Sequence, residues 1–477
     1  MADFFGRQAE RDELLRCLNS NRSEFVIIYG RRRIGKTYLV NNVLGNRLTF
    51  SFTGSHTAPT ERELMRFAMT LANCGLDNGD VPTLNNWYDA FDAIQRLLES
   101  APSGKKVIFI DEMPWIDKRG NQFVSALEDF WNTWAALRGD IMLVACGSAT
   151  SWMNNHLVEN QGGLHGRITS RIRLRPFSLH ECEQYLRAMG CEWDRYQIVQ
   201  CYMTVGGIPY YLSLLAPNKS LEQNIDNLFF DSTSRLSGEF SELYNVLFND
   251  AAKYVDIVKL LAAHPEGLTR QEILKLLKLN SGGGITQRLA NLEACDFITS
   301  YQQSGKKTSN SIYRLTDFYT LFYYKFIEGI NTLGEQYWVY RANDRDVMVW
   351  QGTTFELVCM QHINQIKQAL GIIGIRTTAS AWRNSGEDKA QIDLVIERAD
   401  RMTHLCEMKF STEKFVVTKQ YADRLRERMA IYRQHTGYRH ALINTLVTTV
   451  GLANGIHSGV FANCVTLDDL FVARRLI

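Results

Sequence analysis

Short apolar runs alternate with stretches of helical periodicity in the first third of the chain. Three runs, at 25–29, 107–110 and 142–146, are apolar at every position. Strands that are apolar on both faces are typical of a parallel sheet covered by helices on both sides. The pattern therefore predicts an α/β domain, built on a parallel sheet, over residues 1–175.

Changes of pattern divide the rest of the chain. A helical region comes next, broken by Gly-Gly-Ile-Pro at 206–209, and short helices then lead into a hairpin. The last part returns to mixed α/β, with strands expected at 392–396 and 403–407. A chain of 477 residues has room for several domains of the usual ~150 residues. We place them at 1–175, 176–245, 246–330 and 331–477.

The near-neutral overall charge excludes a protein whose whole surface is basic and binds a polyanion. Lys and Arg number 53 against 51 Asp and Glu, for a net charge of +2. A nucleic-acid partner would therefore have to be held by a local basic patch. The hydrophobic fraction of 45% and the charged fraction of 22% are those of globular proteins and exclude a disordered or fibrous chain.

The cysteines and the N-terminal segment indicate a cytoplasmic protein. The ten cysteines are scattered and form no Cys-x-x-Cys pair, so we expect reduced thiols that fill the core and no zinc cluster. The first fifteen residues are too polar for a signal peptide, and no run of ~18 apolar residues is present to span a membrane. A membrane is not an expected partner.

The sharpest motif is Gly-Arg-Arg-Arg-Ile-Gly-Lys-Thr at 30–37, which fits G-x-x-x-x-G-K-[ST]. It follows a predicted strand and precedes a helical stretch, so backbone N–H groups and a helix N-terminus can face phosphate oxygens. Lys36 would reach the β- and γ-phosphates, and the Thr37 hydroxyl would ligate Mg²⁺. ATP and Mg²⁺ are therefore the predicted ligands. The residues expected to contact nucleotide are Gly30, Arg31, Arg32, Arg33, Ile34, Gly35, Lys36, Thr37 and Tyr38.

Polar residues also end the other two strands. The strand at 107–110 runs into Asp111 and Glu112. Asp111 would hold Mg²⁺ through water, and Glu112 would act as a base or position the attacking water. The strand at 142–146 runs into Gly147 and Ser148. Ser148 is a candidate sensor of the γ-phosphate, with a plain turn as the alternative.

These motifs resemble the archaeal-type P-loop ATPases, which are related to the AAA+ and STAND groups. The matching pieces are GRRRIGKT at 30–37, FGRQAE at 5–10, FIDEMPW at 109–115, CGSA at 146–149 and GGIPYYL at 206–212. The resemblance implies that Phe5, Gly6 and Arg7 lie near the adenine, and that Gly207 and Pro209 contact nucleotide from a helical lid. Without the resemblance, the glycines and the proline at 206–209 predict only a break between two helices.

Arg167 and Arg171 are candidates for an arginine finger. They lie in GRITSRIRLRPF at 166–177, and such a residue neutralises phosphate oxygens in the transition state. The alternative is a pair of solvated basic residues near a strand. A finger supplied by a neighbouring copy would require a homo-oligomer.

Residues 246–330 predict a winged helix-turn-helix. Thr269 and Glu272 form a capping box that opens an apolar-periodic helix. A turn of three glycines at 282–284 precedes a second helix, and a hairpin follows whose loop contains Lys306 and Lys307. Seven Lys/Arg against four Asp/Glu between 265 and 315 is a modest basic excess. Gln287 and Arg288 would face double-stranded DNA. The alternative is a protein spacer or a sensor of nucleotide state.

The C-terminal part resembles the PD-(D/E)XK nucleases, which have a restriction-endonuclease-like α/β fold. Asp393 is followed fourteen residues later by Glu407 and then by Lys409. On paired strands the two carboxylates would hold Mg²⁺, and Lys409 would share their face because strand side chains alternate. The resemblance also implies that Glu356, on a helix expected to begin at Thr354, completes the metal site. Basic residues that would hold a phosphate backbone follow: Lys414, Lys419, Arg424, Arg426 and Arg428.

Three functions remain open on this sequence. The first is an ATP-hydrolysing protein coupled to a nuclease-like domain that acts on DNA, which the presence of Asp393, Glu407 and Lys409 favours. The second is a nucleotide-dependent regulatory switch with protein partners, which the near-neutral charge favours. The third is a DNA-binding ATPase with an inactive C-terminal domain.

Overall fold

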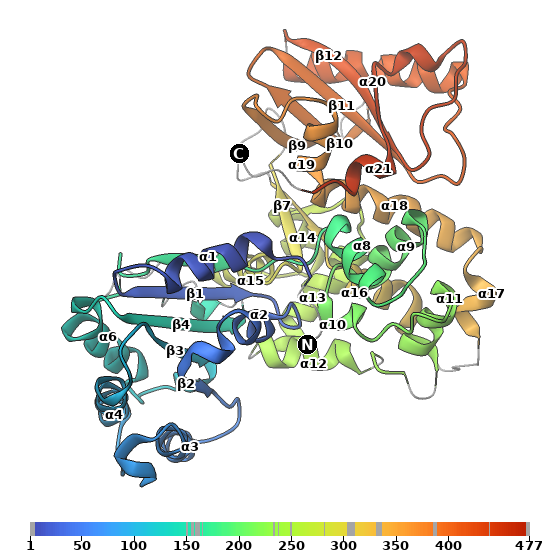
Figure 1. The fold of residues 1–477 in the computed structure, drawn as a ribbon. Helices are drawn as coiled ribbons and strands as arrows, with labels where there is room; N and C mark the ends of the chain where they lie inside the picture. Colours follow the sequence, from blue (N-terminus) through green and yellow to red (C-terminus); the bar gives the residue numbers. More distant parts are fainter. Residues whose placement is uncertain are drawn as a thin grey trace. The chain divides into compact units, whose positions relative to one another are not determined.

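The computed structural model describes residues 5–473 apart from 149–150, 154–156, 158–162, 165, 232–233, 237, 249, 281, 303–310, 331–335, 385–388 and 438. The chain divides into two compact units (Figure 1). Unit 1 comprises Met1–Arg175 with Ala294–Asp296, and unit 2 comprises Pro176–Glu293 with Phe297–Ile477. Each unit is described by itself below.

Unit 1 is built on a five-stranded parallel sheet in the order β2-β3-β4-β1-β5. The strands are β1 (Glu24–Gly30), β2 (Leu48–Thr53), β3 (Lys106–Asp111), β4 (Ile141–Ser148) and β5 (Ser170–Arg173). The three predicted strands are the three central ones. The pattern did not predict β2 and β5, because these edge strands alternate apolar with polar residues instead of being apolar throughout.

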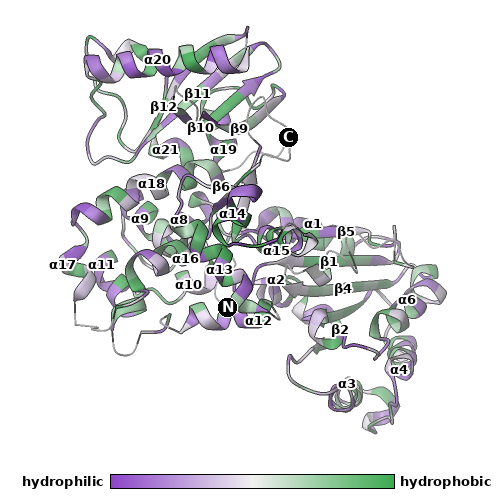
Figure 2. Cartoon of the chain, turned by 180° about the vertical axis from the view of Figure 1, so that it is seen from behind, coloured by the Kyte–Doolittle hydropathy of each residue, from purple (hydrophilic) through white to green (hydrophobic). Residues whose placement is uncertain are grey.

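Helices cover this sheet. The helices α3 (Thr60–Asn73), α4 (Trp87–Ser100) and α6 (Phe123–Thr133) share one apolar cluster with strand residues such as Phe25, Ile27 and Ile108. The helices α1 (Gln8–Leu18) and α2 (Lys36–Leu44) also contact β1. Short helices α5 (Met113–Ile116) and α7 (Ser151–Met153) follow β3 and β4. The hydrophobic colouring of β1 and β4 in Figure 2 matches their burial on both faces.

Unit 2 begins with helices, and three of them, α8, α9 and α11, start with capping boxes. The helices are α8 (Leu179–Ala188), α9 (Arg195–Val205), α10 (Pro209–Leu212), α11 (Leu221–Ile225) and α12 (Glu239–Leu247). Ser178 with Glu181 and Asp194 with Gln197 form capping boxes at α8 and α9. The predicted break is present, because α9 ends at Val205 and Pro209 opens α10.

The next segment contains three helices and a small antiparallel sheet. The helices are α13 (Ala251–Ala262), α14 (Arg270–Leu276) and α15 (Gly283–Ala294), and β6 (Leu268–Thr269), β7 (Ile298–Tyr301) and β8 (Ile312–Leu315) pair in the order β6-β8-β7. The predicted capping box is present at α14, where Thr269 and Glu272 bond reciprocally. The predicted glycine turn is partly wrong, because α15 starts at Gly283. Lys306 and Lys307 lie outside the described residues.

The C-terminal segment carries a mixed five-stranded sheet in the order β13-β12-β11-β10-β9. Its strands are β9 (Thr377–Asn384), β10 (Ala390–Arg398), β11 (Met402–Lys409), β12 (Ala441–Thr448) and β13 (Asn463–Val465). The pairs β9–β10 and β10–β11 are antiparallel, whereas β11–β12 and β12–β13 are parallel. The parallel crossover from β11 to β12 runs through α20 (Lys419–Thr436).

Shorter helices complete this segment. They are α16 (Phe318–Phe322), α17 (Tyr337–Arg341), α18 (Arg345–Gln361), α19 (Ile363–Ala369) and α21 (Leu467–Leu470). The expected helix start at Thr354 is wrong, because α18 begins nine residues earlier, where Asp344 ends the preceding turn. Within the described ranges, no helix combines the length and apolar character needed to cross a bilayer.

Candidate functional site

The carboxyl ends of β1, β4 and β3 meet at one edge of the unit 1 sheet. Gly30 pairs with Ser148, and Ile110 pairs with Ala145, so Asp111 ends β3 two residues before the level of Gly30 and Ser148. Because β4 lies between the other two strands, the glycine-rich loop, Ser148 and the acidic pair come together. Crevices at the carboxyl ends of parallel strands are where open α/β sheets bind ligands.

The glycine-rich loop has the backbone that phosphate binding requires. Gly35 has φ 83°, a conformation that favours glycine, directly before α2. A side chain at Gly30 would lie 2.3 Å from the Leu174 carbonyl oxygen. The Lys36 ammonium is 6% exposed and donates to the carbonyl oxygens of Gly30 (3.1 Å) and Arg31 (3.0 Å). The loop therefore holds its lysine over its own backbone.

A hydrogen bond joins the loop to the acidic strand end. The Thr37 hydroxyl donates to Asp111 Oδ2 at 2.6 Å, and the Glu112 backbone N–H donates to Asp111 Oδ1 at 2.9 Å. A hydroxyl and a carboxylate oxygen this close together are hard oxygen ligands of the type that Mg²⁺ takes in nucleotide sites. The arrangement fits a Mg²⁺-nucleotide.

Glu112 has an unusual backbone conformation and a buried carboxylate oxygen. It has φ 48°, a left-handed conformation that is uncommon for glutamate and is found at functional sites. Its Oε2 is buried and has no hydrogen-bond partner within the part of the chain that the structure describes. Burial raises the pKa of Glu112, while Lys36 opposes the shift and the Ser148 backbone N–H bonds the carboxylate. A carboxylate held this way can accept a proton.

The N-terminal segment contacts the same loop. Arg7 is buried, has φ 58° and donates through Nη2 to the Ile34 carbonyl oxygen at 3.4 Å. Gly6 precedes it with φ 67°. Tyr38 is exposed on α2. The predicted adenine contacts of Phe5, Gly6 and Arg7 remain predictions, and the contact between Arg7 and the loop is what the structure adds.

The two predicted finger residues lie away from the phosphate edge of their own chain. Arg171 pairs with Ile27 in the middle of β1, and Arg167 precedes β5, whose first residue, Ser170, pairs with Val26. Both are exposed. Arg173 pairs with Tyr29, next to the loop, and its Nη2 lies 2.7 Å from Asp296 Oδ1 in the same unit. Sequence reasoning missed Arg173 because only strand register distinguishes it from the neighbouring arginines.

The C-terminal sheet brings the predicted nuclease residues to one face. Leu394 pairs with Cys406 across β10 and β11, so the same antiparallel register places Asp393 opposite Glu407. Lys409 shares the face of Glu407, and their side chains form an ion pair at 2.8 Å. The strand register and the ion pair thus agree with a shared face for these residues, and their role at a metal site stays a prediction.

Glu407 is neutralised by side chains of this chain. Its Oε2 forms an ion pair with Arg428 of α20 at 2.5 Å, and its Oε1 accepts from Lys409 and from the Tyr421 hydroxyl. Burial alone would raise the pKa of Glu407, but Arg428 and then Lys409 lower it to about 2. Arg428, expected to hold phosphate, instead points at this carboxylate. Sequence reasoning missed this role and Tyr421.

Glu356 forms an ion pair of its own, with a strand residue. Its Oε2 lies 3.3 Å from Nη2 of Arg314, a buried residue of β8. Burial raises the pKa of Glu356, and the nearby charge of Asp393 raises it further. The residues with described positions include no group of three His, Cys, Asp or Glu that could hold a metal ion. With both Glu407 oxygens bound to side-chain donors, this arrangement does not fit a metal.

Most of the cysteines fill the core. Eight of the ten are buried, with Cys74 and Cys464 exposed.

Comparison with known proteins finds a similarity in the first part of the chain. Residues 4–215 match the family model of an ATPase domain found predominantly in Archaea. This match covers the glycine-rich loop, Asp111 and Glu112, and Ser148, so the residues of the candidate site lie within the part of the chain that is similar to this ATPase domain.

Relatives of the whole chain are distant. An uncharacterized protein of Methanocaldococcus jannaschii is 24% identical over 399 residues, covering 82% of this chain and 84% of the relative. An uncharacterized ATP-binding protein of the same organism is 43% identical over 44 residues, 9% of this chain and 75% of the relative. Among solved structures, a Walker-type ATPase of Pyrococcus abyssi has a TM-score of 0.47 at 17% identity, covering 67% of this chain and 95% of that one.

Proposed function

We propose that this protein binds ATP with Mg²⁺ at the carboxyl edge of the unit 1 sheet and hydrolyses it. The observation that carries the proposal is the 2.6 Å hydrogen bond between Thr37 and Asp111, which joins the glycine-rich loop to the acidic strand end. The match of residues 4–215 to an ATPase domain supports it.

Each residue of the edge then has a distinct task. Lys36 exchanges the loop carbonyls for phosphate oxygens and neutralises them, and the loop N–H groups orient the triphosphate. Thr37 and Asp111 would hold Mg²⁺, which when bound neutralises charge on the phosphates. Glu112 orients the attacking water and takes its proton, and Ser148 holds the Glu112 carboxylate in place.

Substituting the loop lysine tests this proposal. Lys36→Ala should abolish ATP binding at the glycine-rich loop, because the phosphates lose their main cation there. Isothermal titration with Mg²⁺-ATP measures the effect. Lys253→Ala, which removes an exposed lysine from unit 2, is the matched control and should bind as wild type does. Unchanged affinity in Lys36→Ala would overturn the assignment.

An arginine finger supplied by a second copy is a further part of this proposal. Arg167 and Arg171 are exposed and lie away from the phosphate edge of their own chain, a position that suits action on a neighbouring molecule. Mixing Arg167→Ala or Arg171→Ala with Lys36→Ala protein should then restore turnover at mixed interfaces. A wild-type protein that stays monomeric with ATP, and whose specific activity is constant on dilution, contradicts this.

We infer that unit 2 contains the predicted lid, winged helix and nuclease-like domain. The helix order around the β6-β8-β7 sheet and the capping box at Thr269 support the winged helix. Gln287 is exposed on α15 and Arg288 lies half-buried beside it. If this helix contacts double-stranded DNA, Gln287→Ala with Arg288→Ala should weaken duplex binding in fluorescence anisotropy, and the salt dependence should become shallower. Identical binding curves refute it.

For the C-terminal sheet, the geometry favours a regulatory switch over a nuclease. Glu407 is held by Arg428, Lys409 and Tyr421, so its charge is satisfied without a metal. The placement of Asp393 opposite Glu407 keeps the nuclease as a second candidate. Plasmid nicking by wild type, Asp393→Asn, Glu407→Gln and Lys409→Ala, over Mg²⁺ and Mn²⁺ with and without ATP, separates the two.

The two candidates predict opposite results in that assay. For a switch, neither wild type nor variants cut DNA under any condition, and all keep their ATP turnover. For a nuclease, wild type cuts with a divalent metal, chelator stops it, and each variant loses cleavage. ATP turnover should persist in all of these variants because the residues proposed to bind and hydrolyse ATP, Lys36, Thr37, Asp111 and Glu112, lie in unit 1.

A further inference from the structure

One polar residue interrupts the apolar face of β12 that packs under α20. Leu442 packs against the cluster that contains Tyr432 of α20, and Leu446 lies in a second cluster with Leu425 of α20. Strand side chains alternate, so Asn444 points to the same face between these two leucines. Asn444 is 3% exposed. A core position of this kind ordinarily carries an apolar residue.

The Asn444 amide is only partly satisfied. Its Nδ2 donates to Met429 Sδ at 3.0 Å, which is a weak acceptor, and a second amide hydrogen remains. Its Oδ1 is buried with no hydrogen-bond partner in the portion of the chain that the structure describes. Buried polar atoms in native proteins are nearly always paired, so this acceptor calls for a partner that the described part of the chain does not supply, either water or a ligand.

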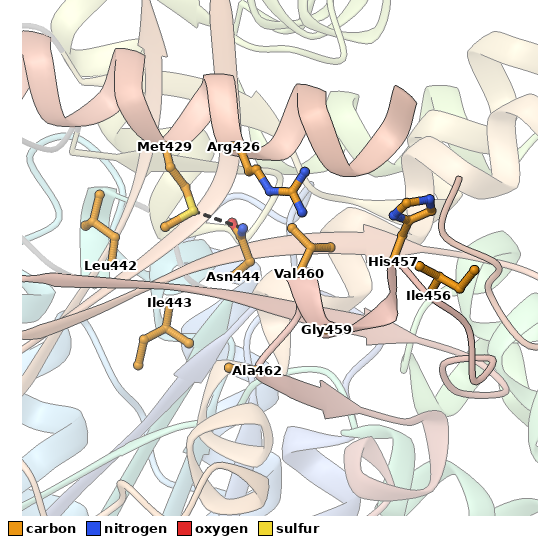
Figure 3. A pocket seen from close by; sticks show the side chains of 10 residues that line it. All are labelled: Arg426, Met429, Leu442, Ile443, Asn444, Ile456, His457, Gly459, Val460 and Ala462. Carbon is orange, nitrogen blue, oxygen red and sulfur yellow. Dashed lines mark hydrogen bonds between the residues drawn. The ribbon is translucent and has the colours of Figure 1, made fainter. Parts of the chain in front are cut away.

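A cavity of about 350 Å³ lies beside this amide (Figure 3). Leu442, Ile443, Val460 and Ala462 give it an apolar lining, and Arg426 of α20 and His457 supply the basic groups. In Figure 3 Asn444 rises from β12 toward α20, where Met429 and Arg426 extend down toward it. The volume is that of a small-molecule site, and the few polar groups converge on one apolar space.

We propose that this cavity binds one adenine nucleotide unit, separately from the ATP site. Asn444 offers an acceptor and a donor side by side, which is the pattern that pairs with the N6 and N7 edge of adenine. Met429 places its thioether against the ring. Arg426, whose exposed guanidinium also pairs with Asp423, and His457 would receive the phosphate. The unit is either a free nucleotide or an adenosine in a single strand.

The test uses AMP and a full-length Lys36→Ala background. AMP lacks the β- and γ-phosphates that the glycine-rich loop holds, and the substitution disables that loop, so any saturable binding reports a second site. We expect equilibrium dialysis to show such binding. Asn444→Leu should weaken it by ~10- to 100-fold, the value of one bidentate base contact.

Two more variants keep the result interpretable. Arg426→Ala should weaken AMP binding, whereas Arg433→Ala removes an exposed arginine from the same helix outside the cavity and should leave it unchanged. Melting temperatures show whether Asn444→Leu is folded. If it is not, Arg426→Ala decides, since that side chain is on the surface.

The source of the nucleotide is settled by competition with a single-stranded oligo(dA). If the oligonucleotide displaces AMP and binds more tightly, the natural ligand is a nucleic-acid strand. If AMP binds and the oligonucleotide does not displace it, the ligand is a free nucleotide. Absence of AMP and oligonucleotide binding, or equal AMP affinity in Asn444→Leu and its parent, overturns the proposal.

Discussion

His362 should make the stability of unit 2 fall in mild acid. It ends α18 and is buried at 2% exposure. Its Nε2 accepts from the backbone N–H of Leu179, so Nδ1 carries the hydrogen and donates to the Val358 carbonyl oxygen at 2.7 Å. Protonation would add a hydrogen to Nε2 and turn that acceptor into a donor facing an N–H. Burial also disfavours the charged imidazolium, and it lowers the pKa of His362 to about 4.

The size of the effect follows from linkage. The folded pKa lies below the ordinary value of 6.5, so the unfolded state takes up a proton first as the pH falls. Stability is fully present above pH 6.5 and is lost progressively between pH 6.5 and pH 4. At 1.36 kcal/mol for each pKa unit, the loss from pH 7.5 to pH 5 is about 2 kcal/mol.

Urea unfolding of the full chain at pH 7.5 and pH 5 measures this. His362→Gln keeps an acceptor near Leu179 but does not titrate, so wild type should lose about 2 kcal/mol more than the variant over this pH interval. His435→Gln removes an exposed histidine and should behave as wild type. Equal pH dependence in wild type and His362→Gln would refute the reasoning.

Three shorter predictions follow from other sites. Glu112→Gln should keep ATP affinity but slow hydrolysis by ~10²- to 10⁴-fold, the usual contribution of a general base; a wild-type rate in a phosphate-release assay contradicts this. Gly207→Ala should lower the free energy of unfolding by at least about 2 kcal/mol, because its Cβ would lie 2.0 Å from a backbone carbonyl oxygen. Gly238→Ala, with open space around it, is the control, and equal urea midpoints would refute the clash. Asn444→Leu should raise the melting temperature of the ligand-free protein, because it removes an unpaired buried acceptor; a lower melting temperature counts against the unpaired amide.

The arrangement of the proposed nucleotide site could be predicted because its residues are close in sequence. Gly30, Gly35, Lys36 and Thr37 lie within one turn, and a parallel sheet brings the ends of its strands to one edge whatever the details of packing. Two buried strands that end in a glycine-rich loop and in Asp111 therefore imply the site. The same holds for Asp393, Glu407 and Lys409, because an antiparallel pair of known spacing places them on one face.

Partners that come from other elements could not be predicted. Arg428 and Tyr421 reach Glu407 from α20, and Arg314 reaches Glu356 from β8. Nothing in the local pattern distinguishes these side chains from solvated ones, because the partner that each side chain contacts depends on which elements pack together. The sequence alone determined which groups are candidates for chemistry. Only the tertiary structure decided that the Glu407 charge is already satisfied, since the energy of a buried carboxylate is set by neighbours brought in by long-range packing.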